Sequence, residues 1–417
     1  MIGSRFPLKS AKRAALIAFL FAVCVFLFGC SSSANNAEIA PGGANPAPPT
    51  GFVFTGSMNL YREGDTATLL NDGTVLIYGG GWQVGYTPTV LTASGGPMPI
   101  DIPAAGCEIY SPSTGTFATL FDTQYIESTY HTATLLQDGT VLIAGGSQLF
   151  PGRWPPAGSF TSAGVIFYPA TRSVVTVGNM STPREEHTAT LLNNGTVLIV
   201  GGAADGEVLA SAELYNPATQ TFTLTGSLNY ARFGHTATLL SNGTVLISGG
   251  SGPSGQFVAS AELYDPSTES FTVTGSLNVA RVSHAATLLN DGSVLITGGV
   301  DSGNNLLSSA ELYNPGTGMF TVTGTLNTAR EWHSATMLDN GMVLIAGGSD
   351  ASSNALSSAE LYDPTTGLFN TVASLNTPRF GHTATLLPNG SVLLAGGTYP
   401  DPTVTGEASY LSSAEIY

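Results

Sequence analysis

The sequence predicts an all-β protein, folded from residue 51 onward as a closed seven-bladed β-propeller with four antiparallel strands in each blade. Three observations predict this fold. Glycine contributes 51 residues and only 10% of residues are charged, against roughly 25% in ordinary soluble domains. One motif recurs seven times along the chain. The segments at the two ends of the repeat array are complementary parts of one more copy.

The repeated segment reads approximately H-T-A-T-L-L-x-N/D-G-T-V-L-I-x-G-G. Its copies begin at Asp65, His131, His187, His235, His284, His333 and His382. The last five are spaced by 48 or 49 residues, and the longer spacings of 66 and 56 residues before them indicate insertions. Two apolar β-rich runs flank an Asp-Gly or Asn-Gly pair, which favours a tight type I′ hairpin because both residues tolerate φ > 0. Each copy therefore predicts two adjacent strands, a and b.

Two further strands complete each repeat. A variable stretch follows the diglycine and leads to A-E-L-Y-N/D-P, which we interpret as strand c. An aromatic residue five positions after the proline opens strand d, which continues as F-T-V-T-G-S-L-N. The residues at this position are Phe117, Val174, Phe222, Phe271, Phe320 and Phe369.

The diglycine, the later tyrosine and the aromatic beyond it resemble the kelch motif across essentially all of residues 51–417. This resemblance implies a kelch β-propeller, similar to the propeller domain of galactose oxidase. The sequence departs from the kelch pattern by having Phe, or Val174 in blade 2, where strand d usually carries Trp. The departure reduces the buried aromatic volume.

The ring is expected to close through its two ends. The last repeat stops at Tyr417, directly after A-E-I-Y, and so has strands a, b and c without d. Residues 52–58 match the missing strand position for position when compared with Phe271 to Leu277. Pairing the N-terminal strand with the last blade removes the unpaired sheet edges that an open ring would expose.

Residues 1–29 are predicted to be a signal peptide. Four basic residues lie within residues 1–13, an apolar run extends to Phe28, and Gly29-Cys30 follows. Leu27-Phe28-Gly29-Cys30 resembles the lipobox of bacterial lipoproteins, although Phe28 replaces the usual small residue, and this resemblance implies that Cys30 is lipidated. A membrane anchor or an ordinary cleaved signal is the alternative. Residues 30–50 are expected to form a flexible tether after the lipidated cysteine.

These features predict a bacterial cell-envelope protein, in the outer membrane if the cell is Gram-negative, or else a secreted one. Beyond residue 30 the chain has eight arginines, no lysine and 28 acidic residues. Such a negative field repels phosphate backbones, which argues against a nucleic-acid partner. Cys107 occupies a position that is Ala in other repeats, which predicts a small buried side chain.

Charged and polar residues recur at fixed positions of the repeat. Six histidines share one position, with Asp65 in blade 1, and sevenfold positions around a wide channel cannot converge as metal ligands must. We therefore expect hydrogen-bonding roles and no metal site. Arginines three residues earlier occur in the same six blades as the A-E-L-Y glutamates, and blade 2 has Ser128 and Val165 instead. This joint loss predicts Arg–Glu pairs, although a ring of arginines binding an anion is the alternative.

The candidate binding residues lie where the repeats differ. The b–c loops are longest in blades 1, 2 and 7, which become neighbours when the ring closes. Exposed aromatic residues among polar groups stack on sugars or anchor protein partners, although here they can instead hold the long loops down. The candidates are Trp82, Tyr86, Phe150, Arg153, Trp154, Tyr399 and Tyr410.

Two functions are compatible with these features. The first is a lipid-tethered binding module for a glycan or a protein, which needs no cofactor. The alternative is a sugar-modifying enzyme, an isomerase, a lyase or a copper oxidase. Galactose-oxidase-like proteins bind copper through tyrosines and histidines, and Tyr130-His131 is the one Tyr-His pair of this chain. We expect no further histidine-bearing domain and no thioether partner for Cys107, and we assign no catalytic residue.

Overall fold

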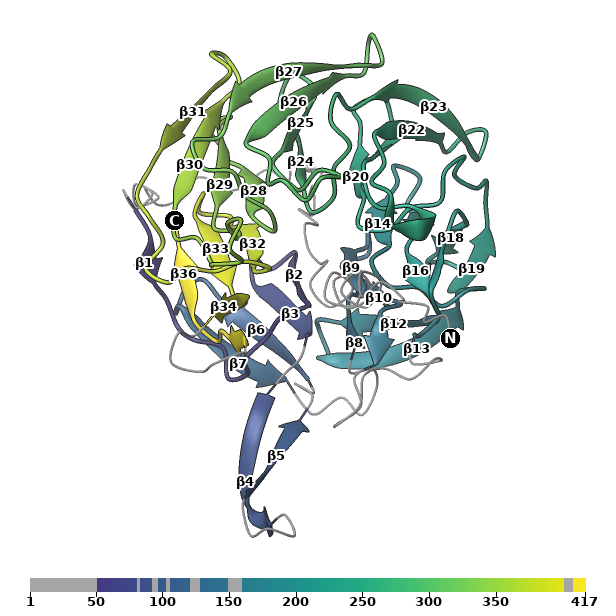
Figure 1. Ribbon diagram of the computed structural model, residues 1–417. Helices are drawn as coiled ribbons and strands as arrows, with labels where there is room; N and C mark the ends of the chain where they lie inside the picture. Colours follow the sequence, from purple (N-terminus) through teal and green to yellow (C-terminus); the bar gives the residue numbers. More distant parts are fainter. Residues whose placement is uncertain are drawn as a thin grey trace, which may run out of the picture.

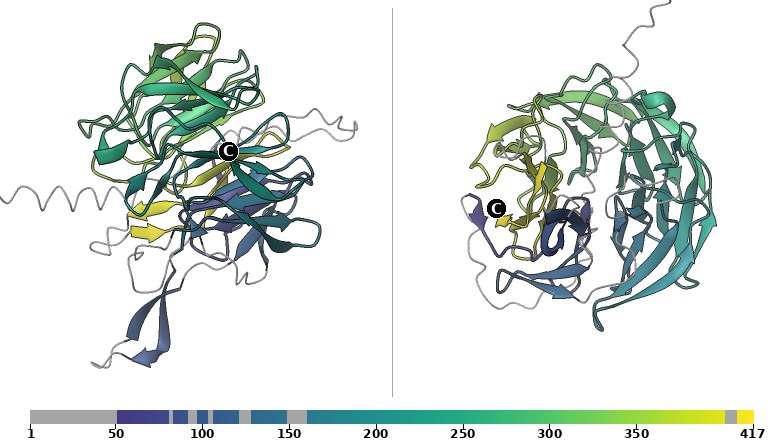
Figure 2. Two further views of the ribbon diagram at one scale, coloured as in Figure 1. Left: turned by 90° about the vertical axis from the view of Figure 1, so that its right-hand side faces the viewer. Right: turned by 60° about the horizontal axis from the view of Figure 1, so that its bottom comes forward.

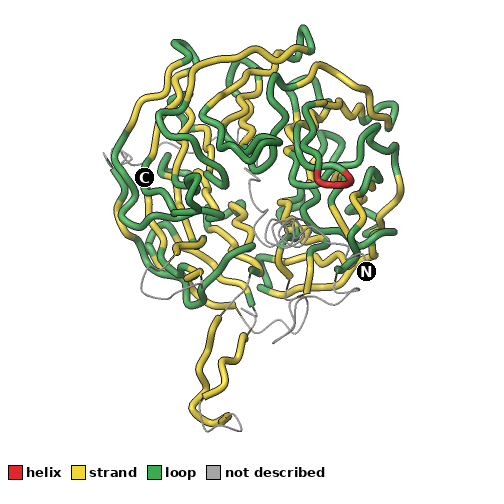
Figure 3. Tube along the Cα trace, in the orientation of Figure 1, coloured by secondary structure: helices red, strands yellow, loops and turns green. Residues whose placement is uncertain are grey.

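The computed structural model describes residues 51–80, 83–91, 97–102, 106–120, 128–148, 160–400 and 408–417. Seven four-stranded antiparallel sheets surround a central axis (Figure 1). The prediction of an all-β, seven-bladed propeller is confirmed. Among the described residues the helical structure is one 3₁₀ turn, η1 (Pro253–Gly255; Figure 3). No helix in these ranges is long and apolar enough to cross a membrane.

Each blade contributes strands a to d from the axis outward. Blade 1 consists of β2 (Asp65–Leu69), β3 (Val75–Gly79), β6 (Cys107–Ser111) and β7 (Thr116–Leu120). Blade 2 consists of β9 (Thr132–Leu135), β10 (Val141–Ala144), β12 (Ala163–Tyr168) and β13 (Ser173–Asn179). Blade 3 consists of β14 (Thr188–Leu191), β15 (Val197–Val200), β18 (Ala212–Asn216) and β19 (Thr221–Leu224).

The remaining blades repeat this order. Blade 4 consists of β20 (Thr236–Leu239), β21 (Val245–Ser248), β22 (Ser260–Asp265) and β23 (Ser270–Ser276). Blade 5 consists of β24 (Ala285–Leu288), β25 (Val294–Thr297), β26 (Ser309–Asn314) and β27 (Met319–Thr325). Blade 6 consists of β28 (Ser334–Met337), β29 (Val343–Ala346), β30 (Ala359–Asp363) and β31 (Leu368–Thr371). Blade 7 consists of β32 (Thr383–Leu386), β33 (Val392–Ala395), β36 (Ala414–Ile416) and β1 (Val53–Phe54).

The ring closes as predicted. The innermost strands contact one another in sequence around the axis, and β2 of blade 1 contacts β32 of blade 7. Strand β1 supplies the outer strand of blade 7, where Val53 pairs with Ile416 and Phe54 with Glu415. The first and last segments of the propeller thus share one sheet.

The apolar core lies between consecutive blades. Strand b is buried along its whole length in each blade, as in β15 and β29. One cluster joins Leu295 of blade 5 to Ile345 and Tyr362 of blade 6. The tyrosine that ends strand c packs on the aromatic that opens strand d, with ring centroids 4.7 Å apart for Tyr362 and Phe369. In blade 2 the corresponding cross-strand pair is Phe167 and Val174.

The a–b hairpins differ from the predicted type I′ turn. In blade 1 the Leu70 amide donates to the Thr74 carbonyl, so three residues form the loop, and of these Gly73 alone has positive φ. The Asp72 carboxylate accepts from the backbone amide and hydroxyl of Thr74. A three-residue loop with glycine in the left-handed position is the next most common hairpin connection. The Asx turn favours it over the two-residue turn.

Short hairpins extend from several b–c connections. They are β4 (Gln83–Leu91) with β5 (Pro97–Ile102), β16 (Ala203–Ala204) with β17 (Glu207–Val208), and β34 (Thr398–Pro400) with β35 (Ala408–Tyr410). In blade 2, β11 (Ser147–Gln148) of the b–c connection pairs instead with β8 (Ser128–Thr129), which precedes strand a. The β4–β5 hairpin projects from the ring in both figures (Figures 1 and 2). The repeat pattern predicts loops for these segments, and the structure shows paired strands.

Candidate functional site

The predicted rim residues fall mostly outside the described residues. Trp82, Phe150, Arg153 and Trp154 lie there entirely, and for Tyr86 only the backbone, in β4, is described. Tyr399 and Tyr410 lie in the β34–β35 hairpin of blade 7, where both side chains are half-buried. Whether the rim aromatics form one surface therefore stays a prediction.

The b–c loops and the d–a segments share one face of the ring, which we call the b–c face. Isolated bridges join the two kinds of segment in blade after blade, for example Glu185 with Ala203, and Glu331 with Ser349. Across the seam, Arg62 of blade 1 pairs with Leu411 of blade 7. The d–a segments therefore form the inner part of the face that carries the long loops.

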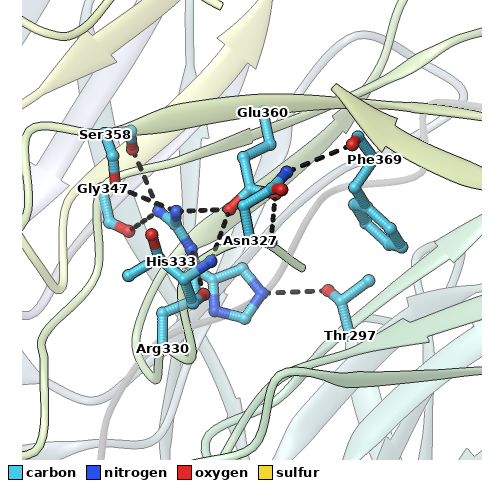
Figure 4. A network of polar contacts seen from close by, with 9 residues as sticks. Thr297, Asn327, Arg330, His333, Gly347, Ser358, Glu360 and Phe369 are labelled. Atoms are coloured by element: carbon cyan, nitrogen blue, oxygen red, sulfur yellow. Dashed lines mark hydrogen bonds and ion pairs between the residues drawn. The ribbon is translucent and has the colours of Figure 1, made fainter. Parts of the chain in front are cut away.

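A buried Arg–Glu network repeats in six blades, as shown for blade 6 in Figure 4. The Arg330 guanidinium lies 2.8 Å from Glu360 Oε1 and donates to the carbonyls of Gly347 and Ser358. Glu360 Oε2 accepts from the backbone amide and side-chain amide of Asn327. Neither charged side chain is more than 1% exposed.

The predicted Arg–Glu pairing is confirmed, and the alternative of an anion-binding arginine ring is wrong for these residues. The pairs are Arg62–Glu108, Arg184–Glu213, Arg232–Glu262, Arg281–Glu311, Arg330–Glu360 and Arg379–Glu415. In blade 2 the Ser128 hydroxyl donates to the Gly145 carbonyl, replacing the arginine bond to the same backbone position. Val165 is fully buried in place of the glutamate.

The six histidines join neighbouring blades through hydrogen bonds, as predicted. His131 Nε2 lies 3.0 Å from Thr66 Oγ1 of the preceding blade, and His187 makes the same contact with Thr132. His333 lies 2.9 Å from Thr297, because Ala285 replaces the usual threonine. The diglycine makes room for the ring, since a Cβ on Gly347 would lie 2.9 Å from His382 Cε1.

A collar of seven residues with positive φ surrounds the axis on the b–c face. Each stands directly before the histidine position, and the φ values run from +51° to +76°. The collar residues are Gly64, Tyr130, Glu186, Gly234, Ser283, Trp332 and Gly381. Backbone hydrogen bonds link neighbours, as from Glu186 N to Tyr130 O and from Gly381 N to Trp332 O. A non-glycine residue in this region is strained, and such strain concentrates at functional sites.

One sector of the collar gathers carboxylates around a phenol. Glu63 and Glu185 directly precede collar positions in blades 1 and 3, while Tyr130 and Glu186 are themselves collar residues. Glu185 and Glu186 are 8% and 5% exposed, and Glu63 is half-buried. We call Glu63, Tyr130, Glu185 and Glu186 the acidic sector.

Burial raises the pKa of every group in the acidic sector. Burial raises the pKa of Glu63 and of Glu185 to about 7. Burial, and then the charge of Glu185, raises the pKa of Glu186 well above its usual range. The pKa of Tyr130 is raised well above its usual range by burial and by Glu63, Glu185, Glu186 and Tyr410. Tyr130 is therefore the residue that the three glutamates share as a neighbour, and Tyr410 connects it to the predicted rim.

The chain matches the family described as Attractin/LZTR1 beta-propeller over residues 170–397, which is more than half of its length. The chain belongs to this family. The match agrees with the kelch-type repeats expected from the motif. No curated protein sequence matches the chain.

Solved structures similar to this Attractin/LZTR1-type propeller include a copper-bound fungal alcohol oxidase of the AA5 family. The identity is 18%, the alignment covers 88% of this chain and 75% of the oxidase, and the TM-score is 0.66. At this identity the similarity shows the fold alone. In the present chain His131 bonds to Thr66, and Cys107 is a free thiol buried in the core. Among the described residues no three His, Cys, Asp or Glu side chains are placed to hold a metal ion.

The four acidic-sector residues of this Attractin/LZTR1-type propeller are not among the binding residues predicted from the sequence. Glu63, Glu185 and Glu186 occupy variable positions inside the most uniform part of the repeat. One signal in the sequence could have revealed the collar: Gly64, Gly234 and Gly381 share one repeat position. A left-handed backbone required there in three blades implies the same backbone at Tyr130, Glu186, Ser283 and Trp332.

Asp65 interrupts the histidine contacts at the seam between blades 7 and 1. It is 1% exposed, and neither carboxylate oxygen has a hydrogen-bond partner among the described residues. Burial raises the pKa of Asp65 to about 7, against the smaller lowering effect of Arg62. A raised pKa means that the folded chain holds this proton more tightly than the unfolded chain. The protonated Asp65 carboxyl therefore makes its full contribution to the free energy of unfolding below about pH 4. This contribution is lost as the pH rises through about 7 and the carboxyl ionises.

Asp65→Asn should be more stable than the parent at pH 8, and its advantage should grow by about 3 kcal/mol between pH 4 and pH 8. Other titrating groups are present in both proteins and cancel in the difference. Urea unfolding of both proteins at pH 4 and pH 8 measures this difference in the free energy of unfolding. As a control, Asp339→Asn at an exposed position should change the free energy of unfolding by less than about 0.5 kcal/mol at both pH values. An unchanged difference for Asp65→Asn would show that this carboxyl titrates normally.

Proposed function

We propose that this protein is an exported, lipid-anchored binding module whose b–c face recognises a glycan or a protein ligand. One observation carries the proposal: the structural contacts repeat around the ring, whereas the b–c face is asymmetric. The Arg–Glu network recurs in six blades. The acidic sector and the β4–β5 and β34–β35 hairpins belong to blades 7, 1, 2 and 3. A face that varies on a uniform scaffold is where propellers place recognition.

The rim aromatics are proposed to make the primary contact. Trp82→Ala and Trp154→Ala should each abolish binding of hits from a glycan array or a protein pull-down, while the melting temperature stays nearly constant. Trp332→Ala is the matched control, because Trp332 is 7% exposed and stacks on Phe380 with centroids 5.6 Å apart. It should lower the melting temperature. Equal losses of stability in all three variants would mean that the rim tryptophans only hold the loops down.

Lipid anchoring is proposed to proceed through Cys30. Cys30→Ser should move the protein from the membrane fraction to the soluble or secreted fraction, because the thioether-linked lipid can no longer form. Fractionation followed by immunoblotting measures this shift, with Cys107→Ser as the control that keeps Cys30. A membrane fraction unchanged by Cys30→Ser would reject the lipoprotein interpretation.

A sugar isomerase or lyase is the second candidate function, and the carboxyls of the acidic sector favour it. General acid–base catalysis needs groups that titrate near the working pH, and burial raises the pKa of Glu63 and Glu185 to about 7. Mass spectrometry of glycan-array hits incubated with the protein tests this candidate. A new product that Glu185→Gln does not form supports catalysis, and recovery of unchanged glycan supports binding alone.

A further inference from the structure

Within the acidic sector, Glu186 has a buried carboxylate oxygen that makes no hydrogen bond to the described residues. Its side chain is 5% exposed, and Oε2 has no hydrogen-bond partner in the part of the chain that the structure describes. A buried carboxylate oxygen normally accepts hydrogen bonds, and leaving one unsatisfied costs about 1–3 kcal/mol or more. The backbone of Glu186 also has φ of +52°, a strained conformation for a residue with a side chain. The fold thus maintains an unsatisfied acid in a strained position.

Glycines on either side of the sector give its side chains room. A Cβ on Gly234, the next collar residue, would lie 3.6 Å from Glu186 Oε2. A Cβ on Gly64, the preceding collar residue, would lie 3.6 Å from Cε1 of the Tyr130 ring. Both Tyr130 and Glu186 therefore extend along the collar beside positions without side chains.

The described residues place no free cation beside these carboxylates. Six of the eight arginines after residue 30 are each paired with a glutamate. Arg172 lies in a c–d turn, on the opposite face of the ring, and Arg153 lies outside the described residues. Residues 51–417 contain no lysine. Within the described ranges the sector thus has no cationic side chain of its own as a partner, and a ligand cation can fill this role.

We propose that the acidic sector binds the side-chain ammonium group of a lysine from a protein partner. This inference rests on the proposed function, since it names the chemistry recognised by the same face. An ammonium group has three donors and can serve Glu186 together with the neighbouring Glu185. Its slender four-carbon chain can reach Glu185 and Glu186, which are more than nine-tenths buried. The Tyr130 ring offers an additional cation–π contact.

The same chemistry selects against other occupants. The amino group of an amino sugar is attached directly to the ring, so the whole ring would have to approach the buried carboxylates. A second copy of the propeller has no lysine to insert. The negative field of the chain, with 28 acidic residues against eight arginines after residue 30, attracts basic partners over a distance.

Calorimetry with the full chain in detergent tests the proposal. The probes are the peptide Gly-Ser-Lys-Ser-Gly and the same peptide with an acetylated lysine side chain. The free lysine peptide should bind at least about tenfold more tightly, because acetylation removes the charge. Glu186→Gln should weaken binding of the lysine peptide by at least about tenfold. Glu207→Gln, at an exposed site on the same face, should change it by less than about twofold.

Folding of the variant is checked separately. Glu186→Gln should melt at or above the temperature of the parent, because an amide in this position has no charge to desolvate. Equal affinity for the two peptides, or unchanged affinity in Glu186→Gln, overturns the proposal. The proposal is also overturned if the lysine peptide does not bind and calcium or glucosamine binds in a way that depends on Glu186. If Trp82→Ala abolishes binding of the array or pull-down ligand but the lysine peptide does not bind the parent, this inference is rejected. The proposed function is then still supported.

Discussion

Arg330→Ala should lower the free energy of unfolding by about 3–5 kcal/mol, because it leaves Glu360 buried without a counter-charge. Arg330 also donates to the Gly347 and Ser358 carbonyls and to Ser358 Oγ, and these acceptors lose their partner. Urea unfolding followed by circular dichroism measures the loss. Arg172→Asn, at an exposed arginine with φ of +53°, is the control and should change stability by less than about 0.5 kcal/mol.

Blade 2 shows how the same position can be filled without charge. Ser128 bonds to the Gly145 carbonyl, and Val165 is fully buried where other blades have the glutamate. The double variant Arg330→Ser with Glu360→Val copies this arrangement and should recover at least about 1–2 kcal/mol of the loss, because no buried charge remains. A double variant less stable than Arg330→Ala would show that each charged group contributes independently of its partner.

The repeated contacts were predictable because they leave a joint trace in the sequence. Arginine and glutamate occur in the same six blades and disappear together in blade 2, which identifies a pair without any coordinates. Ring closure was predictable for a similar reason, since residues 52–58 match strand d of the other repeats. The histidine contacts followed from their shared position.

Features that depend on local backbone geometry were not predictable in the same way. Asp72-Gly73 is compatible with two hairpin types, and the Asx bond to Thr74 decides between them. The β4–β5 hairpin has no counterpart in the other repeats from which its pairing could be inferred. Glu63 and Glu185 come from blades 1 and 3 and both act on Tyr130 of blade 2, so only the folded ring brings them to one side chain.

Removal of residues 1–58 should prevent formation of a stable ring, whereas removal of residues 1–50 should leave the melting temperature almost unchanged. The longer deletion removes Phe52 and Met58, which are 7% and 4% exposed. Loss of a buried Phe costs about 3–5 kcal/mol and loss of a buried Met about 2–5 kcal/mol. Their sum is comparable to the whole stability of a typical domain, about 5–15 kcal/mol.

The N-terminal segment holds three consecutive blades together, which is why its deletion should act on the ring as a whole. In blade 7, Thr55 N donates to Ala414 O, and Phe52 packs on Tyr417 with ring centroids 4.9 Å apart. Asn376, from the connection between blades 6 and 7, donates to the Phe52 carbonyl at 2.9 Å. Gly56 N donates to Gly115 O of blade 1 at 2.7 Å.

Without this segment, β36 would present an unpaired edge, and such edges pair with other chains. Size-exclusion chromatography with light scattering should therefore find oligomers or aggregates for the longer deletion and a monomer for the shorter one. Phe52→Ala keeps the backbone pairing and should cost about 3–5 kcal/mol while the protein stays monomeric. If the longer deletion remains monomeric and melts within a few degrees of the shorter one, blade-to-blade packing alone holds the ring closed.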